Sequence, residues 1–269
     1  MGDVYRAFVG SIPHYYDRYL VPLIFQPYAE DLVARVRPAP KMRVLELACG
    51  TGVVTQLLAK RLDAHSRLVA SDLNPAMIEI AREKASSDDR ITWEKIDATD
   101  LPFGDATFDE VVCQFGVMFF PDRPRALAQA RRVLRSGGRI LFNTWDRLAN
   151  CPVFAEADRE IRACFPDDPP RFYDIPFGLY DQEAVKALVR DAGFRDVEIH
   201  NVRLSGVHEK PVEIATGIIR GGPFATEIEQ RGGDVEEVVV RTARRLATKY
   251  GDDPIASPMS AFITMAIAD

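Results

Sequence analysis

The sequence has few cysteines and few histidines. It contains 4 cysteines and 4 histidines in 269 residues. The cysteines form no Cys-x-x-Cys pair and the histidines are scattered, so the spacing of a zinc site or of a disulfide framework is missing. We therefore expect no metal site and reduced thiols, as in a cytoplasmic protein.

Long apolar runs are missing too. No stretch approaches the roughly 20 apolar residues that a membrane-spanning helix needs. The N-terminal segment carries Asp3 early and lacks the apolar core of a signal peptide. Arg6 stands where an N-myristoylation signal has Ser or Thr. We expect a cytoplasmic location with no membrane span.

The sequence has no excess of basic residues. Lys and Arg total 34 against 40 Asp and Glu, which gives a formal net charge of −6. Without a basic stripe, nucleic acid is not an expected partner. Hydrophobic residues make up 47% of the chain, enough for a substantial core, and the length suits one large domain or a core domain with an elaboration.

A regular alternation of predicted strands and helices is present instead. Strands are predicted at 43–48, 67–71, 90–96, 109–115, 139–145, 197–205 and 260–268. A helix predicted at 122–135 ends at Ser136-Gly137-Gly138, and Asp181 begins another. Residues 150–180 are predicted as a loop with short helices. Repeated β-α-β units indicate an α/β fold with parallel strands and helices on both faces.

Three regions of one domain, 1–269, can be distinguished. Residues 1–40 are predicted as a helical cover, with two or three short helices interrupted by Pro22 and Pro27. Residues 41–146 form the predicted ligand-binding core. Residues 147–269 add the last strands and a lid insertion at about 206–255, which is predicted to be helical in two pieces.

The stretch RVLELACGTG (43–52) follows the pattern strand, glycine turn, helix. Gly50 and Gly52 leave room for a ligand against the backbone and tolerate a positive φ. In parallel sheets, ligands bind beyond the carboxyl ends of the strands. A ligand site is therefore predicted over this turn.

Other strand ends converge on the same place. Asp72 ends the second predicted strand, where its carboxylate can accept hydrogen bonds from both hydroxyls of a ribose. Asp97 ends the third, and a carboxylate beside the Ala98 N–H can pair with the edge of an adenine. The predicted apolar cover for that ring consists of Leu73, Met77 and Phe115.

The turn does not fit a pyrophosphate. A dinucleotide site has the pattern G-x-G-x-x-G, but Thr55 stands at the third glycine position. Glu46 adds a carboxylate within an apolar strand, which is costly unless it finds donors or a cation. An adenosine with a positive centre and no phosphate, such as S-adenosylmethionine, matches this arrangement better.

With these motifs in order, the sequence resembles the class I S-adenosylmethionine-dependent methyltransferases, and within them the small-molecule group that includes the ubiquinone/menaquinone-biosynthesis methyltransferases. The resemblance covers about residues 40–146. It is carried by VLELACGTG (44–52), ASDLNPAMIEIA (70–81), DATDLPFGDATFDEVVCQFGVMFFPD (97–122) and RVLRSGGRILFNTWD (132–146).

The resemblance implies a Rossmann-like, seven-stranded, mostly parallel sheet of order 3-2-1-4-5-7-6, whose last strand is antiparallel, under a helical lid. It implies S-adenosylmethionine as cofactor and S-adenosylhomocysteine as product. Tyr16 and Asp17 would lie on the helix that covers the cofactor, and Gln114 and Phe115 beside the sulfonium. The residues implied to bind the cofactor are Tyr16, Glu46, Ala48, Gly50, Gly52, Asp72, Leu73, Met77, Asp97, Ala98, Gln114 and Phe115.

The acceptor is the least determined part of the prediction. The Phe, Tyr, Pro and Ile content of the cover and lid predicts a small apolar or aromatic molecule, methylated on O, N or C. No general base is identified; His14 and Tyr15 rank first because they lie in the predicted cover, ahead of His200 and His208. Two alternatives stay open: a nicotinamide-dependent oxidoreductase, and a non-catalytic cofactor-binding protein of the same fold.

Overall fold

The computed structural model describes residues 8, 10–208, 210–252 and 254–269. Parts of the predicted helical segment at the N-terminus, residues 1–7 and 9, therefore lie outside the described residues. Across the described ranges, no helix combines the length and apolarity needed to cross a bilayer.

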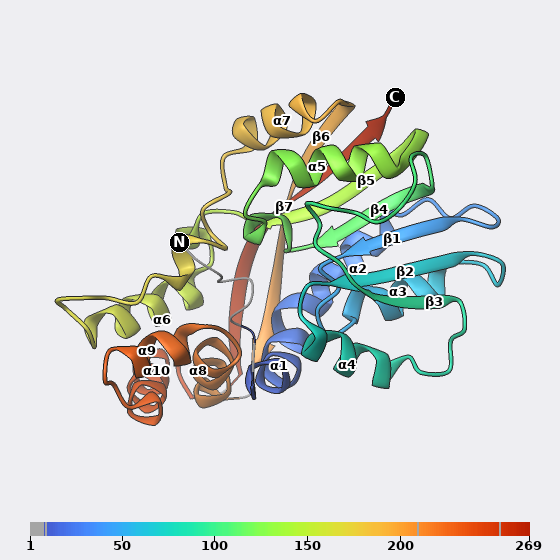
Figure 1. Cartoon of the computed structure of the whole chain (residues 1–269). Coiled ribbons are helices and arrows are strands. Elements are labelled where there is room, and N and C mark those ends of the chain that lie inside the picture. The colour runs from blue at the N-terminus through green and yellow to red at the C-terminus, as the bar shows by residue number, and fades with distance from the viewer. Residues whose placement is uncertain (1–7, 9, 209, 253) are drawn as a thin grey trace.

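One seven-stranded sheet has the order β3-β2-β1-β4-β5-β7-β6, which confirms the predicted order (Figure 1). Strands β1 to β5 pair in parallel, and β7 is antiparallel to both β5 and β6. The strands are β1 (Arg43–Leu47), β2 (Arg67–Asp72), β3 (Ile91–Lys95), β4 (Phe108–Gln114), β5 (Leu134–Trp145), β6 (Phe194–His208) and β7 (Ile255–Ala268).

Helices cover both faces of the sheet (Figure 1). Val44 and Leu45 are neighbours in β1 and both fully buried, yet they belong to separate hydrophobic cores, because successive side chains of a strand point to opposite faces. Val44 packs in the core of α2 (Gln26–Ala34), α3 (Val53–Arg61) and α4 (Pro75–Lys84). Leu45 belongs to the core of α5 (Arg123–Val133) and α7 (Gln182–Asp191).

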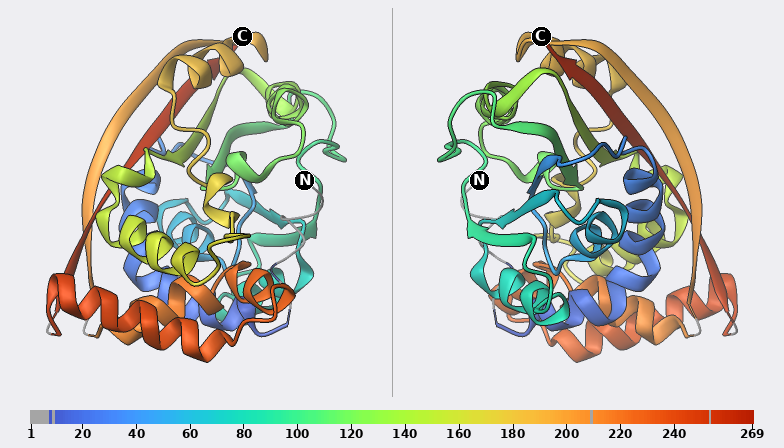
Figure 2. Two further views of the ribbon diagram at one scale, coloured as in Figure 1. Left: turned by 90° about the vertical axis from the view of Figure 1, so that its left-hand side faces the viewer. Right: turned by 90° about the vertical axis from the view of Figure 1, so that its right-hand side faces the viewer.

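A long antiparallel ribbon carries the remaining helices. β6 and β7 pair from Phe194 with Ala268 to His208 with Ile255, whereas β7 pairs with β5 only over Ala261–Ile267. The ribbon therefore projects beyond the sheet, and the helices between its strands lie at its far end (Figure 2). These helices are α8 (Pro211–Arg220), α9 (Phe224–Gln230) and α10 (Val235–Tyr250).

The N-terminal segment packs beside α8. It consists of α1 (Ile12–Tyr15) and the π-helical η2 (Tyr16–Phe25), which leads into α2. The expectation that Pro22 interrupts the helix is wrong, because η2 runs through it. Pro27 lies in the first turn of α2, which follows η2 without a break, so the change from π-helix to α-helix falls beside it.

Three further expectations are corrected. β5 begins at Leu134 and runs through Ser136–Gly138, because Leu134 pairs with Phe108 instead of ending the helix. Residues 150–180 include a full helix, α6 (Pro152–Ala163), which begins with a proline in its first turn. The lid has three helices instead of two pieces, because each glycine pair separates one helix from the next.

Helices α6 and α10 are joined by a buried carboxylate. Glu156 is 1% exposed and accepts hydrogen bonds from Arg159 (2.7 Å), Arg245 (2.5 Å) and Lys249. Burial alone would raise its pKa, but hydrogen bonds from Lys249 and Arg245 outweigh burial and lower the pKa to about 2. The ionised carboxylate therefore stabilises the folded lid.

We predict that this stabilisation is lost in acid. An unfolded glutamate has a pKa of about 4.3, so the contribution is fully present above that pH and disappears as the pH falls toward the folded value. In urea unfolding, the free energy of unfolding should fall less from about pH 5 to about pH 3 in Glu156→Gln than in the wild type. Glu79→Gln, at an exposed position of α4, is the control and should fall as the wild type does. Equal slopes in all three proteins would contradict the prediction.

Candidate functional site

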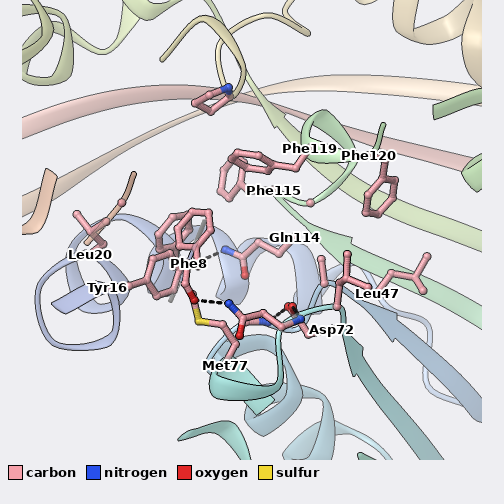
Figure 3. Close-up of a pocket in the computed structure, with 18 of the residues that line it drawn as sticks. Phe8, Tyr16, Leu20, Leu47, Asp72, Met77, Gln114, Phe115, Phe119 and Phe120 are labelled. Atoms are coloured by element: carbon pink, nitrogen blue, oxygen red, sulfur yellow. Dashed lines mark hydrogen bonds between the residues drawn. The ribbon is translucent and has the colours of Figure 1, made fainter. Parts of the chain in front are cut away.

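A pocket of about 200 Å³ lies at the carboxyl ends of β1, β2, β3 and β4. In Figure 3, Tyr16 and Phe8 lie on one side, Asp72 and Met77 below, and Phe115 above. The volume is smaller than the roughly 300–1,000 Å³ typical of small-molecule sites.

Asp72 holds the two turns at the polar end of the pocket. Its Oδ2 accepts a hydrogen bond from the Gly50 N–H (2.9 Å), and its Oδ1 accepts one from the Asn74 N–H (2.8 Å). Desolvation by burial raises the pKa of Asp72, while these backbone donors oppose the rise. Each oxygen keeps a further lone pair, so the carboxylate can still accept hydrogen bonds from ligand hydroxyls.

The neighbouring strand end supplies a second polar position. Asp97 Oδ1 accepts hydrogen bonds from the Thr99 N–H (2.8 Å) and hydroxyl (2.7 Å), which fixes the turn after β3. The Ala98 N–H donates to no other residue in the part of the chain that the structure describes. Asp97, Ala98, Leu73 and Met77 all line the pocket, and their role as an adenine site stays a prediction.

Gln114 and the N-terminal segment close the pocket. Gln114 donates from Nε2 to the Phe25 carbonyl (2.7 Å), and its buried Oε1 accepts no hydrogen bond from the described residues. The Tyr16 hydroxyl lies 3.8 Å from where a Cβ on Gly50 would be, and burial raises the pKa of Tyr16 so that it stays protonated. Lys84 of α4 forms an ion pair with Asp17 of η2.

Two strand ends have an unusual backbone. Ala48 follows β1 with φ +53°, and Phe115 follows β4 with φ +48°. Positive φ is uncommon for residues other than glycine and costs free energy, of order 1–3 kcal/mol each. Both residues line the pocket, together with Gly50.

Two predicted residues do not line the pocket. Glu46 is 1% exposed and accepts a hydrogen bond from the Thr55 hydroxyl (2.6 Å), and burial raises its pKa to about 8. Gly52 faces α4, where an added Cβ would lie 2.8 Å from Cβ of Ala81. Gly52 therefore allows α3 and α4 to approach each other.

Three of the four candidate bases do not line the pocket. His14 is exposed, and Tyr15 stacks on Tyr19 with ring centroids 6.1 Å apart. His200 is exposed beside Glu198. The His208 side chain lies outside the described residues.

Apart from Phe115, which was predicted to bind the cofactor, the aromatic end of the pocket was not assigned from the sequence. Trp145 ends β5, so the rule that identified Asp72 would also have identified it. The other residues of this end come from two groups of segments. Some lie in the residues after β4; the rest lie in η2, α6, the turn η5 (Phe172–Asp174), the residues after it, and α8, which the sequence marked only as cover or lid. This aromatic end is lined by Leu20, Ile24, Phe25, Phe115, Phe119, Trp145, Phe154, Phe172, Tyr173, Phe177 and Ile218.

The conformation of the first turn is testable with two glycines. Gly52 has φ +83° and no room for a Cβ, whereas Gly137 has φ +78° and nothing within 4 Å of one. Gly137→Ala should lower the free energy of unfolding by about 1 kcal/mol, from the backbone alone. Gly52→Ala should lower it by about 2–4 kcal/mol, because the methyl group also strikes α4. Equal losses in urea unfolding would exclude the close approach of α3 and α4.

Comparisons with known proteins match the part of the chain that contains the first four strand ends. The family described as "Methyltransferase domain" matches residues 44–138. The chain is 31% identical to the demethylmenaquinone methyltransferase of Clavibacter sepedonicus over 177 residues, which cover 62% of this chain and 71% of the relative. It is 29% identical to the ubiquinone/menaquinone biosynthesis C-methyltransferase UbiE of Idiomarina loihiensis over 176 residues, covering 60% and 69%.

Solved structures share the fold. The Haemonchus contortus phosphoethanolamine N-methyltransferase 2, in complex with S-adenosyl-L-methionine, aligns with a TM-score of 0.62 at 18% identity, covering 99% of this chain and 60% of that one. The YcgJ protein of Bacillus subtilis aligns with a TM-score of 0.57 at 17% identity, covering 89% and 97%. At these identities the likeness concerns the fold.

Proposed function

We propose that this chain, which belongs to the class I S-adenosylmethionine-dependent methyltransferases, methylates a carbon atom of a small aromatic acceptor. The observation that carries the proposal is one continuous pocket with a polar end at Asp72 and Asp97 and an aromatic end at Trp145 and Phe172. The choice of carbon follows relatives named as C-methyltransferases, and an aromatic acceptor agrees with relatives named for menaquinone biosynthesis.

The polar end fits the cofactor of this family. Asp72 would hold the ribose hydroxyls, and Asp97 with Ala98 the adenine edge. The buried Gln114 Oε1, which lacks a donor among the described residues, would accept a hydrogen bond from the amino group of the methionine part. Apolar contact with the adenine ring would come from Leu73 and Met77.

The residues in and around the first turn would have two roles: contact with the methionine part of the cofactor, and support of the turn. Ala48 and Gly50 would border the methionine part, and Tyr16 would cover it. Glu46 and Gly52 lie behind the pocket, so we assign them to the support of the turn: Glu46 through Thr55, and Gly52 through its contact with α4.

The aromatic end would orient the acceptor and exclude water. S-adenosylmethionine supplies an activated methyl group when bound. The chain has to place the acceptor atom in line with that group in a dry site, which can lower the barrier by several kcal/mol. The lining described for this end includes no Lys, Arg, His, Asp or Glu. Its buried Tyr173 has a pKa that burial raises well above the usual value. Their contribution is therefore orientation and not proton transfer.

The two alternative functions lose their support. The chain belongs to a methyltransferase family, and its turn has Thr55 where a dinucleotide site needs a third glycine. Neither an oxidoreductase nor a non-catalytic protein is required to explain any feature of the pocket.

We predict that Asp72→Asn weakens S-adenosylhomocysteine binding about 10- to 100-fold, because the neutral amide loses charge-assisted hydrogen bonds to the ribose. Calorimetric titration measures this directly. Asp100→Asn, at an exposed position outside the pocket lining, is the control and should bind as the wild type does. Wild-type affinity in Asp72→Asn would remove Asp72 from the site.

The acceptor class is tested by transfer of a labelled methyl group. S-adenosylmethionine labelled in its methyl group is offered with reduced demethylmenaquinone, with simple phenols and with polar amines. We expect label on a ring carbon of the aromatic compounds, located by NMR. Transfer only to the polar amines would overturn the aromatic acceptor and leave the cofactor site intact.

A further inference from the structure

Phe115 is held in a backbone conformation that its own side chain disfavours. It follows β4 with φ +48°, in the left-handed region, which is an outlier for a bulky residue. Such conformations persist only where the surroundings impose them. The contacts that impose this one identify a residue outside the pocket.

The first contact is a buried hydrogen bond from the neighbouring strand. The Phe115 N–H donates to Oδ1 of Asn143 in β5 at 2.7 Å. Asn143 is fully buried, and its Nδ2 donates to no described residue. A buried amide with an unused donor costs free energy compared with an apolar side chain. The contribution of Asn143 at this position is therefore the hydrogen bond that its Oδ1 accepts.

The second set of contacts is made by the ring. Phe115 stacks on Trp145 with centroids 4.0 Å apart and planes inclined by 8°. Tyr28 meets both rings edge-on, each at 5.4 Å, and Phe25 meets Phe115 at 5.8 Å. We call these four residues, Phe25, Tyr28, Phe115 and Trp145, the aromatic wall.

The wall joins the two ends of the pocket. Phe115 and Trp145 both line it, whereas Asn143 does not. The residue after Phe115, Gly116, packs against the first turn so closely that a Cβ there would lie 2.6 Å from Cβ of Ala48. A change in the Phe115 backbone would therefore move the stacked pair relative to the cofactor turn.

We infer that Asn143 is a positioning residue, which fixes the Phe115 backbone and thereby places the Phe115–Trp145 pair in the lining of the acceptor end of the pocket. The inference rests on the proposed function for the identity of the acceptor, but not for the geometry of the wall. A planar acceptor ring would pack against this lining, as aromatic pairs do with centroid separations of about 4.5–7 Å. Asn143 thereby controls acceptor binding without touching the acceptor.

Tryptophan fluorescence tests the positioning directly. The chain has 2 tryptophans, Trp93 and Trp145, so Trp93→Phe leaves Trp145 as the only reporter. In that background, Asn143→Leu should raise the acrylamide quenching of Trp145 by about twofold or more, because the loosened pair opens to solvent. Thr144→Val, which alters the adjacent fully buried polar residue of β5, is the matched control and should leave the quenching unchanged.

A double-mutant cycle separates positioning from general loosening. If Asn143 acts through Phe115, Asn143→Leu should add nothing to the quenching already raised by Phe115→Leu. Additive effects, or equal effects of Asn143→Leu and Thr144→Val, would overturn the inference. Should Asn143→Leu fail to fold, Asn143→Ala removes the same acceptor without adding an apolar branch.

Two affinities distinguish this inference from the proposed function. S-adenosylhomocysteine binding should stay within about twofold of wild type in Asn143→Leu, while the KM for the methylated aromatic compound rises about 10-fold. A parallel loss of both affinities would contradict a role confined to the wall. If the wild type binds no S-adenosylhomocysteine, the proposed function fails, and the Trp145 quenching still decides whether Asn143 positions Phe115.

Discussion

The arrangement of the pocket depends on one carboxylate that spans two turns. Asp72 accepts a hydrogen bond from Gly50, after β1, and another from Asn74, after β2. It thereby fixes the edge of the crevice where the polar end of the pocket begins. Asn74 in turn caps α4 through its side chain and donates to the Phe8 carbonyl. The positions of the first turn, of α4 and of the N-terminal segment therefore all depend on the Asp72 carboxylate.

The pocket brings together two kinds of surface with different origins. The polar end consists of strand ends, which the sheet holds rigidly in place. The aromatic end joins Trp145 of β5 and Phe115, which follows β4, to side chains from the N-terminal segment, α6, η5 and α8, which lie outside the sheet. This division agrees with a constant cofactor and a family-specific acceptor, because loops and insertions can vary while the scaffold is kept.

The sequence predicted the strands and the residues of the polar end from local patterns, whereas the order of the strands came from the resemblance to the methyltransferases. An apolar run followed by a carboxylate marks a strand end wherever it occurs, as for Asp72 and Asp97. The start of β5 was wrong because Leu134 is buried in either structure, and only its pairing with Phe108 decides between helix and strand. The aromatic end could not be assigned, since Phe172 and Ile218 meet only through the packing of distant segments. The orientation of Glu46 also depends on packing, because its hydrogen bond partner Thr55 lies on the helix behind.

The position of β7 affects how the protein emerges from the ribosome. β7 follows α10 in the chain, yet it lies between β5 and β6 and pairs with both. During synthesis, the edge of β5 therefore stays open until β7 has been made, although the five parallel strands are already available. An open strand edge is a template for pairing with other chains. While α8, α9 and α10 are being synthesised, that edge of β5 therefore has no partner strand yet.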